Sequence, residues 1–350
     1  MKILSMDQKR GYIELVVEND TDIWVLYTIL EEKDLVSAKT TRDIKFESGS
    51  ERVSMTLTVR VEKVEFQPFS DKLRIHGVIV EGPEEYGVKG KYHTLSIGIG
   101  DKITIWKEKW FEHQIKRLVE RRALSRILVT LFDYYSVCIA MASEQGVKVL
   151  EESDSGVPSR KDRGSIDEFM KNYMFDLVDT IIKYIDNSGV NLVLIASPLD
   201  YAKKLKLLLA ERRKDLKIYV DHVSSGDCSS LKEALARDSF KEIVRDAHFV
   251  KIQDILEEFK KLLIDKLEYV AYGLEEVEEM VLNNAVSKLL VSEELIKSYE
   301  TSIRARVENM LEEAYVRRAE IYIVPREHPV HVEIKGFGGV VAILRYPVYR

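Results

Sequence analysis

Three cations lie close together just before an expected helix. Arg160, Lys161 and Arg163 occupy a stretch rich in glycine, proline and serine, which is typical of a loop. Ser165 and Glu168 then have the spacing of a capping box, so a helix is expected to begin there. The first turn of a helix exposes unpaired N–H groups, and together with the loop cations these favour an anion. A phosphate backbone and an acidic protein surface both fit this chemistry.

Two other groups of cations surround predicted turns nearer the N-terminus. The first group flanks a Gly/Ser turn between two predicted strands and comprises Lys39, Arg42, Lys45 and Arg52. The second group lies beside Tyr86 and Tyr92 and comprises Lys89, Lys91 and His93. Basic groups next to aromatic rings suit contact with an RNA backbone and stacking on its bases. Solvated hairpin tips are the alternative interpretation, and the residue types alone leave both open.

Acidic side chains are dense near residue 20. Glu18, Asp20 and Asp22 could hold a divalent cation through their carboxylates. The alternative role is structural: Asp20 or Thr21 caps a helix that starts at Asp22, because acidic groups favour a helix N-terminus. We expect the capping role.

Other kinds of catalytic site find no support in the sequence. There is no G-x-x-x-x-G-K-[ST] phosphate loop, and the glycine-dense stretch "IKGFGGVVAIL" lacks the lysine and hydroxyl that hold a phosphate. No G-x-S-x-G or comparable nucleophile motif is present. Of the seven histidines only His328 and His331 lie close together, which is too few ligands for a zinc site. We therefore expect this chain not to hydrolyse GTP or ATP itself.

The composition favours an ordinary globular protein of two or three domains, with 350 residues of which 45% are hydrophobic. No apolar run approaches the roughly 18 residues that span a bilayer, and the first residues turn charged at once, unlike a signal peptide. With only Cys138 and Cys228 a disulfide framework is not expected, and Cys138 is expected in a core. We expect a cytoplasmic protein. Scarce glutamine with abundant Lys, Arg and Glu is typical of heat-adapted proteins.

The net charge is −6, so no global field draws the molecule to nucleic acid. The charge of residues 1–125 is balanced, with 21 basic and 21 acidic side chains. Residues 252–350 are acidic, with 13 basic and 18 acidic side chains. Any RNA contact must therefore come from local loops, and the last third suits a protein partner instead.

Residues 1–124 show mainly the alternation of β-strands. The pattern is strongest at 52–67, and further strands are expected at 11–19, 34–46, 72–82 and 101–110. A helix is expected at 20–30, and a second helix at 111–124 carries the chain out of this domain. Several short strands with one helix predict a small β-barrel.

The remaining residues alternate between strands and helices. Residues 125–251 predict apolar strands within 126–143, a helix from 165 to about 189, a strand at 190–197, a helix at 198–212 and a strand at 217–223. Residues 252–350 follow with helices near 250–265, 271–286 and 302–318 and strands near 287–295, 319–325 and 338–348. Both patterns predict α/β domains, the first with a partly parallel sheet.

Several long motifs, in order, resemble the Pelota family in its archaeal form. They are "DLVSAKTTRDIKF", "HTLSIGIGDKITIWKEKW", "SRKDRG", "AYGLEEVEEMVLNNAVSKLLVSEEL" and "GFGGVVAILRYPV". The resemblance runs from end to end. It implies a multidomain α+β fold: an Sm-like RNA-binding β-barrel at 1–124, then two α/β domains at 125–251 and 252–350 that are similar to those of peptide-chain release factor subunit 1.

The resemblance also implies a function. Pelota proteins enter the empty or blocked A site of a stalled ribosome with a translational GTPase, which in archaea is elongation factor 1-alpha in its GTP form. They promote dissociation of the ribosome with a recycling ATPase of the ABC class, in no-go and non-stop mRNA surveillance. Lys39, Arg42 and Lys45 would contact decoding-centre RNA or mRNA. The cations at 160, 161 and 163 would contact the GTPase or ribosomal RNA. We expect a monomer that needs no cofactor for binding.

Release factors carry a Gly-Gly-Gln tripeptide in their central domain, and residues 151–189 contain neither that tripeptide nor any glutamine. Hydrolytic peptide release is therefore not expected. Some Pelota proteins are described as divalent-metal-dependent endoribonucleases, which is the alternative hypothesis. Asp20, Asp22 and Asp43 are its candidate metal ligands, but no general base is arranged beside them in the sequence. We favour a binding factor without chemistry of its own.

Overall fold

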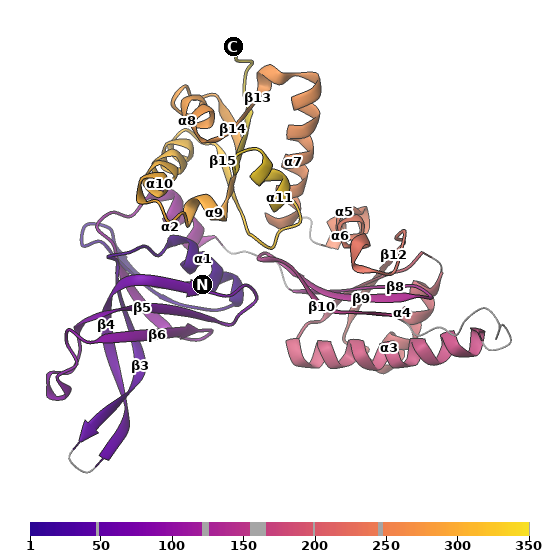
Figure 1. The fold of residues 1–350 in the computed structure, drawn as a ribbon, viewed down its shortest axis with the longest axis horizontal. Helices are drawn as coiled ribbons and strands as arrows, with labels where there is room; N and C mark the ends of the chain where they lie inside the picture. The colour runs from indigo at the N-terminus through magenta and orange to yellow at the C-terminus, as the bar shows by residue number, and fades with distance from the viewer. Residues whose placement is uncertain (47–48, 121–125, 155–165, 199, 244–247, 350) are drawn as a thin grey trace. The chain divides into compact units, whose positions relative to one another are not determined.

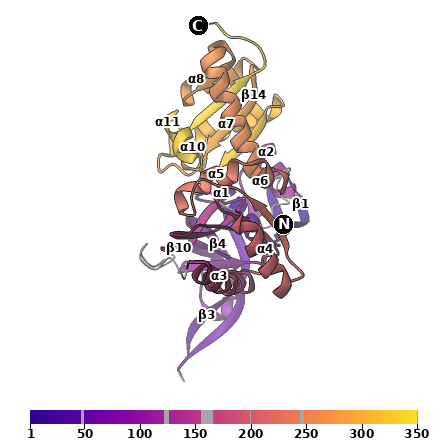
Figure 2. The same cartoon turned by 90° about the vertical axis from the view of Figure 1, so that its right-hand side faces the viewer.

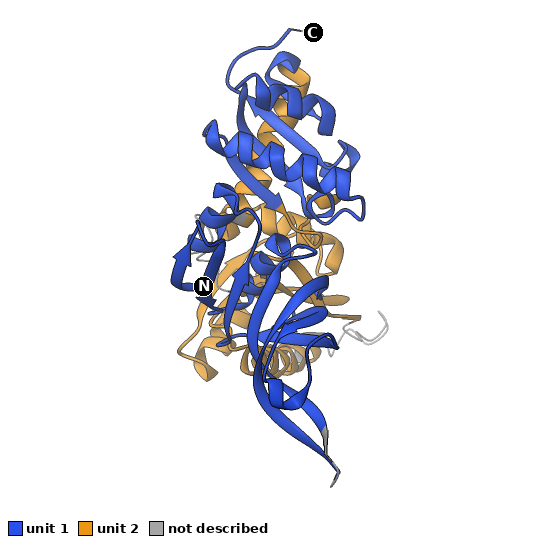
Figure 3. Cartoon of the chain, turned by 90° about the vertical axis from the view of Figure 1, so that its left-hand side faces the viewer, with its two compact units in different colours: residues 1–122, 266–323, 334–350 blue, residues 123–265, 324–333 orange. Residues whose placement is uncertain are grey.

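The computed structural model describes residues 1–46, 49–120, 126–154, 166–198, 200–243 and 248–349. The chain forms two compact units (Figure 3). The first comprises residues 1–122, 266–323 and 334–350, and the second comprises residues 123–265 and 324–333. The first unit thus joins segments from opposite ends of the sequence. Whether residues 1–124, 125–251 and 252–350 fold as separate domains stays a prediction.

The N-terminal part of the first unit is a seven-stranded sheet in the order β1-β2-β7-β3-β4-β5-β6. Its strands are β1 Lys2–Asp7, β2 Tyr12–Val16, β3 Leu35–Phe46, β4 Gly49–Phe66, β5 Lys72–Glu81, β6 Tyr92–Gly98 and β7 Lys102–Trp106. All neighbouring pairs are antiparallel. Burial alternates as the sequence predicts: in β5, Leu73 and Ile75 are fully buried while Lys72 and Arg74 are exposed.

The predicted barrel is not closed, and this part of the expectation is wrong. β1 and β6 end the sheet order, and no backbone pairing joins them in the described part of the chain. The edge of β6 is instead met by side chains from β3, since Arg42 Nη1 donates to the carbonyl of Tyr92 at 2.8 Å. Alternating sequence patterns are the same in open and closed sheets, so the sequence could not decide this point.

The C-terminal part of the first unit is a four-stranded sheet in the order β13-β16-β14-β15. Its strands are β13 Val270–Tyr272, β14 Val286–Ser292, β15 Glu320–Val324 and β16 Val340–Leu344. The helices with it are α8 Leu274–Leu282, α9 Glu293–Ile296 and α10 Thr301–Val316. α11 His331–Gly336 begins in the second unit and ends in the first. One continuous cluster of buried apolar side chains includes both this sheet and the N-terminal one, with Ile29 and Val307 among its members.

Two short helices lie with the N-terminal sheet: α1 Asp20–Ile29 and α2 Glu112–Val119. α1 is buried over most of its length, including Trp24, whose Nε1 donates to Glu293 Oε2 of α9 at 2.7 Å. α2 contacts α10, α1 and β1. Both helices therefore form the contact between the N-terminal and C-terminal parts of the first unit.

The second unit has a five-stranded sheet in the order β10-β9-β8-β11-β12. The strands are β8 Ile127–Phe132, β9 Ser136–Ser143, β10 Gly146–Asp154, β11 Leu192–Ala196 and β12 Lys217–Asp221. β8, β11 and β12 are parallel, whereas β9 and β10 are antiparallel additions, so the predicted partly parallel sheet is confirmed. The segment 324–333 also belongs to this unit, since Val147 N donates to the carbonyl of Glu327 at 3.0 Å.

Helices cover both faces of this sheet (Figures 1 and 2). α3 Ile166–Ser188 and α4 Tyr201–Arg212 pack on one face, and α5 Leu231–Ala236, α6 Asp238–Ile243 and the start of α7 His248–Asp265 pack on the other. Leu128 and Phe132 of β8 face the first layer, while Val129 and Leu131 face the second. Every residue of β8 is buried, including Thr130, because helices cover both faces of the sheet. None of the described helices is long and apolar enough to cross a membrane.

A disulfide joins Cys138 of β9 to Cys228 in the short 3₁₀ turn before α5, with the two Cα atoms 5.1 Å apart. The expectation of unpaired cysteines is therefore wrong, although Cys138 lies in the core as predicted. The two residues are 90 positions apart, and only the packing of the 222–230 segment over the sheet brings them together. Disulfides inside cells are an established feature of heat-adapted proteins, which agrees with the composition.

Replacing Cys138 and Cys228 together by serine should lower the free energy of unfolding by about 2–4 kcal/mol, because the crosslink restricts the unfolded chain. Denaturant unfolding of the oxidised chain and of the C138S/C228S variant measures this difference. Reductant should destabilise the wild-type chain and leave the variant unchanged. Equal stability of the oxidised chain and the variant would contradict the prediction.

Candidate nucleic-acid interface

The β3–β4 hairpin carries most of the cations that the sequence singled out. Its far end extends away from the rest of the sheet (Figure 1). Lys39 pairs with Thr56 and Asp43 pairs with Arg52, so these side chains share one face of the hairpin. Lys39 and Arg52 are exposed there, and Arg52 Nε donates to Thr41 Oγ1 at 3.1 Å. Position 45 pairs with Ser50 through the backbone, and the Lys45 side chain lies outside the described part.

Arg42 does not join that face. It pairs with Val53 on the opposite side of the hairpin and reaches β6, where Nη1 lies 2.8 Å from the Tyr92 carbonyl and 3.2 Å from His93 Nδ1. His93 Nε2 lies 3.0 Å from Thr40 Oγ1. The guanidinium has only donors, so Nδ1 must accept and the ring proton must sit on Nε2. The predicted group is thus split between two faces because side chains alternate along a strand.

The electrostatics of His93 agree with this assignment. Burial lowers the pKa of His93, and the positive charge of Arg42 lowers it further. A neutral ring can keep accepting from Arg42, which holds the guanidinium against the backbone carbonyl of Tyr92. The Tyr92 ring itself is 71% exposed.

The solvent side of β4, β5 and β6 is also basic. Arg60 pairs with Val78, which in turn pairs with Tyr92, so these three side chains share a face. Two steps along the same face, Arg74 pairs with Glu65, and Lys63 Nζ lies 2.6 Å from Glu65 Oε1. Sequence reasoning missed Arg60, Lys63 and Arg74. The alternation of the predicted strands already assigns Arg60 and Arg74 to the solvent side and could have found them.

The turn before β6 extends this basic side. Lys89 and Lys91, both named from the sequence, are exposed there, and Lys91 directly precedes Tyr92. The solvent side of β4–β6 therefore combines several cations with the exposed Tyr92, and it also carries acidic groups such as Glu62 and Glu65. Such a surface can contact phosphates and stack a base without any catalytic group.

Two family models match the chain. Residues 1–122 match the model described as the Pelota N-terminal domain, and residues 249–348 match the model described as eRF1 domain 3. Over 355 aligned residues the chain is 45% identical to the protein pelota homolog of Staphylothermus marinus, covering 100% of this chain and 99% of that relative. This chain belongs to the Pelota family.

Solved Pelota structures share the fold. The crystal structure of the Thermoplasma acidophilum Pelota protein matches with a TM-score of 0.73 at 21% identity, covering 99% of this chain and 100% of that one. Dom34 of S. cerevisiae matches with a TM-score of 0.52 at 18% identity, covering 99% of each chain. The expected multidomain α+β architecture is confirmed.

The acidic cluster of this Pelota chain serves its own helix. Asn19, rather than Asp20 or Thr21, caps α1, and its side chain accepts from the N–H of Asp22 at 2.9 Å. Asp22 is buried, and its Oδ2 accepts from the N–H groups of Glu18 at 2.8 Å and Asn19 at 3.2 Å. The structural role is correct, but the predicted capping residue is wrong by one position.

The other ligand candidates are also dispersed. Asp43 pairs with Arg52 on the hairpin rather than with the cluster at α1. His328 is buried, with Nε2 3.1 Å from the carbonyl of Phe249, and its pKa is lowered by burial. Over the described residues no group of three or more His, Cys, Asp or Glu side chains is placed to hold a metal ion. The divalent cation required by the ribonuclease hypothesis stays a prediction.

Arg160, Lys161 and Arg163 lie outside the described residues. The helix that they were expected to precede is present as α3. Their contact with a GTPase or with ribosomal RNA stays a prediction.

Replacing Arg42 by alanine should raise the pKa of His93, because the positive charge beside Nδ1 is removed while the burial of the ring remains. NMR titration of the His93 ring measures this pKa. Lys39→Ala is the matched control, since Lys39 lies on the other face of the same strand and should leave the titration unchanged. An identical His93 titration in Arg42→Ala and wild type would show that Arg42 does not set the protonation of the ring.

Proposed function

We propose that this chain is a ribosome rescue factor. It recognises stalled ribosomes in no-go and non-stop surveillance and promotes their dissociation with a translational GTPase, without hydrolysing peptidyl-tRNA. The observation that carries the proposal is the full-length match to a Pelota protein at 45% identity. Dom34, which shares the fold, is described as a translation termination-like factor involved in RNA quality control pathways and interacting with Hbs1.

The N-terminal sheet supplies the contacts with ribosomal RNA and mRNA. The first four residues of β3 pair with β7 within the sheet, so the projecting part of the hairpin comprises residues 39–46 of β3 and is about 26 Å long at roughly 3.3 Å per residue. A projection of this length, with Lys39 and Arg52 exposed on one face, can follow an RNA backbone away from the body of the sheet. The exposed ring of Tyr92, with Lys91 beside it, offers a second contact near its base.

The partners are separate chains. The sequence has no phosphate loop, which supports a GTPase acting in trans, namely elongation factor 1-alpha in its GTP form. The acidic balance of residues 252–350 suits protein partners, among them the ABC-class recycling ATPase. The chain acts as a monomer in the cytoplasm.

The geometry does not favour the endoribonuclease alternative. The carboxylate of Asp22 is buried and already accepts from two backbone N–H groups. Asp43 faces Arg52 across the hairpin. Neither group is placed to activate a water for attack on RNA.

Binding of the full chain to purified ribosomes tests the proposal. Ribosomes stalled with an empty A site should bind the chain more tightly than ribosomes whose A site holds tRNA. The K39A/R52A double variant should bind stalled ribosomes more weakly. The slope of the logarithm of its affinity against the logarithm of the salt concentration, here called the salt slope, should fall in magnitude by about 2, because each lost phosphate contact removes about 1. The affinities are measured by fluorescence at several salt concentrations.

K171A/K183A is the matched control, since it removes two exposed lysines from α3 and should leave the salt slope unchanged. Equal affinity for empty and occupied A sites would contradict the proposed function. An unchanged salt slope in K39A/R52A would contradict only the role of the hairpin.

A further inference from the structure

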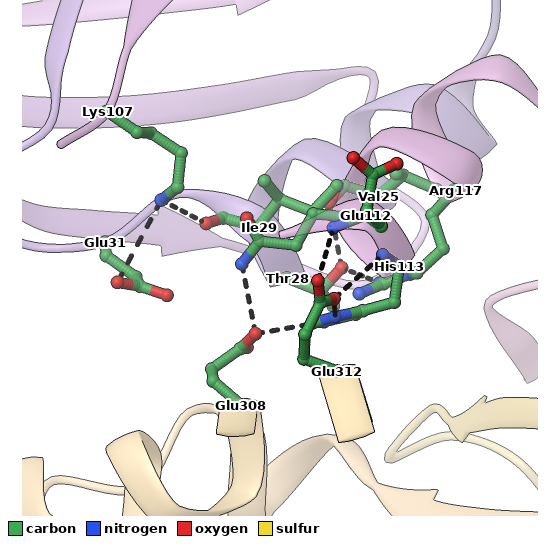
Figure 4. A network of polar contacts seen from close by, with 11 residues as sticks. Val25, Thr28, Ile29, Glu31, Lys107, Glu112, His113, Arg117, Glu308 and Glu312 are labelled. Atoms are coloured by element: carbon green, nitrogen blue, oxygen red, sulfur yellow. Dashed lines mark hydrogen bonds and ion pairs between the residues drawn. The ribbon is translucent and has the colours of Figure 1, made fainter. Parts of the chain in front are cut away.

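A cavity of about 320 Å³ lies within the first unit, between its N-terminal and C-terminal parts. Residues 31–33, which connect α1 to β3, line one side of it, and Phe111, the N-cap of α2, lines another. Helix α10 provides the remaining lining. Figure 4 shows two of the lining side chains, Glu31 beside Lys107 and Glu308 extending from α10 toward α2. Neither the basic side of the N-terminal sheet nor the acidic cluster at the start of α1 is part of this cavity.

One face of α10 supplies most of the polar groups of the cavity. Thr301, Arg304 and Glu308 are three and four residues apart along the helix, so their side chains share that face. Arg304 Nη2 donates to Thr301 Oγ1 at 3.5 Å and lies 3.9 Å from Glu32 Oε1. The Glu32 side chain is 57% exposed. The guanidinium of Arg304 therefore belongs to the outer part of the cavity.

Glu308 is the buried acid of the cavity, with 5% of the residue exposed. Its Oε2 accepts from Gln114 Nε2 at 3.0 Å, and the His113 ring lies beside the same oxygen. In the described contacts its Oε1 accepts no hydrogen bond, and neither Arg304 nor Lys33, the two cations that line the cavity, reaches it. A buried carboxylate oxygen without a donor is unfavourable. Glu308 Oε1 therefore favours a molecule in the cavity that can donate.

Glu31 is a second acid of the cavity whose carboxylate lacks a donor in the described contacts. Lys107 Nζ lies 3.9 Å from Glu31 Oε2, which is too far for a hydrogen bond. Burial raises the pKa of Glu31; the charge of Lys107 opposes this, and the negative charges of Glu308 and Asp34 add to it. Glu31 and Glu308 are thus close enough to repel each other, and a cation between them would stabilise both carboxylates.

The two buried lysines of this region already have partners. Lys107 Nζ lies 2.7 Å from Asp34 Oδ2 and donates to the carbonyl of Ile29 at 3.0 Å. Lys297 Nζ donates to the carbonyl of Leu30 at 2.6 Å, and burial, followed by the charge of Lys107, lowers the pKa of Lys297 to about 8. Neither lysine lines the cavity. The charged residues that do line it are Glu31, Glu32, Glu308, Lys33 and Arg304, which leaves an excess of one negative charge.

We propose that this cavity binds a primary alkylammonium ion, with the ammonium group between Glu31 and Glu308 and the alkyl chain along Phe111 and Ala305. An ammonium group has three N–H donors and no acceptor, which suits two carboxylates that lack donors. The side chains of Phe111 and Ala305 give the methylene groups an apolar contact. A volume of about 320 Å³ is within the range of small-molecule sites. Aliphatic polyamines carry this group as free molecules, and lysine side chains carry it on proteins. The inference does not rest on the proposed function.

NMR titration of the full chain with n-butylammonium and with putrescine tests the site, followed through the amide signals of Lys33, Arg304 and Asn309, which line the cavity. Both amines should shift these signals saturably at millimolar concentrations. Trimethylbutylammonium has the same charge and chain as n-butylammonium but no N–H donor, so it should bind about tenfold more weakly or less. Tighter binding of putrescine would support a free polyamine as the natural source. Equal affinities of the two amines would support a single ammonium group, as on a lysine side chain.

E31Q and E308Q should each weaken the binding of n-butylammonium by about tenfold, because each removes one charged acceptor. E31Q keeps the proposal testable if E308Q fails to fold, since the Glu31 carboxylate accepts no hydrogen bond in the described contacts. E279Q is the matched control: it removes the same charge from an exposed position on α8, outside the cavity, and should bind like the wild-type chain. The proposal would be overturned by wild-type chain that shows no saturable shifts at the cavity, by equal binding of trimethylbutylammonium, or by unchanged affinity in E31Q.

Discussion

The contact between α2 and α10 is the constraint on which the first unit depends. It joins the N-terminal part to a helix that lies about 190 residues later in the sequence. The contact is made by the His113 ring and the carboxylates of Glu308 and Glu312. The apolar cluster that runs through both sheets supplies most of the driving force for packing. Buried ion pairs add little net stability, but breaking one costs about 3–5 kcal/mol because a charge is left unpaired. The polar contacts between α2 and α10 therefore select one packing of the two sheets and add little to the overall stability of that packing.

This arrangement leaves the basic side of the N-terminal sheet free for another molecule. Buried acidic side chains of the first unit already have partners there: Asp34 pairs with Lys107, and Glu293 accepts from the indole N–H of Trp24. Lys39 and Arg52 remain exposed on the hairpin. The net charge of residues 1–125 is zero and does not indicate this local cluster of cations. A chain with negative net charge can in this way present a cationic surface to RNA.

Local patterns predicted the elements that carry strong periodicity. The alternation over 52–67 appears as β4, and the apolar stretch at 20–30 appears as α1. β1 was missed because Leu4 and Met6 are exposed at the edge of the sheet, so its pattern does not separate inside from outside. β6 was missed because its apolar positions are few and lie between turn residues.

Long-range pairings could not be read from the sequence. The disulfide links residues 90 positions apart, and nothing local to Cys228 marks it as a partner of Cys138. His113 resembles an ordinary core histidine until Glu308 and Glu312 are placed beside it. For the candidate site, residue types alone suggested Lys39, Arg42 and Arg52 as one group. Lys39 and Arg52 are exposed, whereas the strand register places the half-buried Arg42 on the other face.

A reconstituted dissociation assay tests the central claim most directly. Stalled ribosomes are mixed with the chain, GTP-loaded elongation factor 1-alpha and the ABC-class ATPase with ATP, and subunits are separated on a sucrose gradient. Stalled ribosomes should separate into subunits only when the chain is present, with peptidyl-tRNA still intact. Equal dissociation with and without the chain, or release of the peptide from its tRNA, would contradict the account.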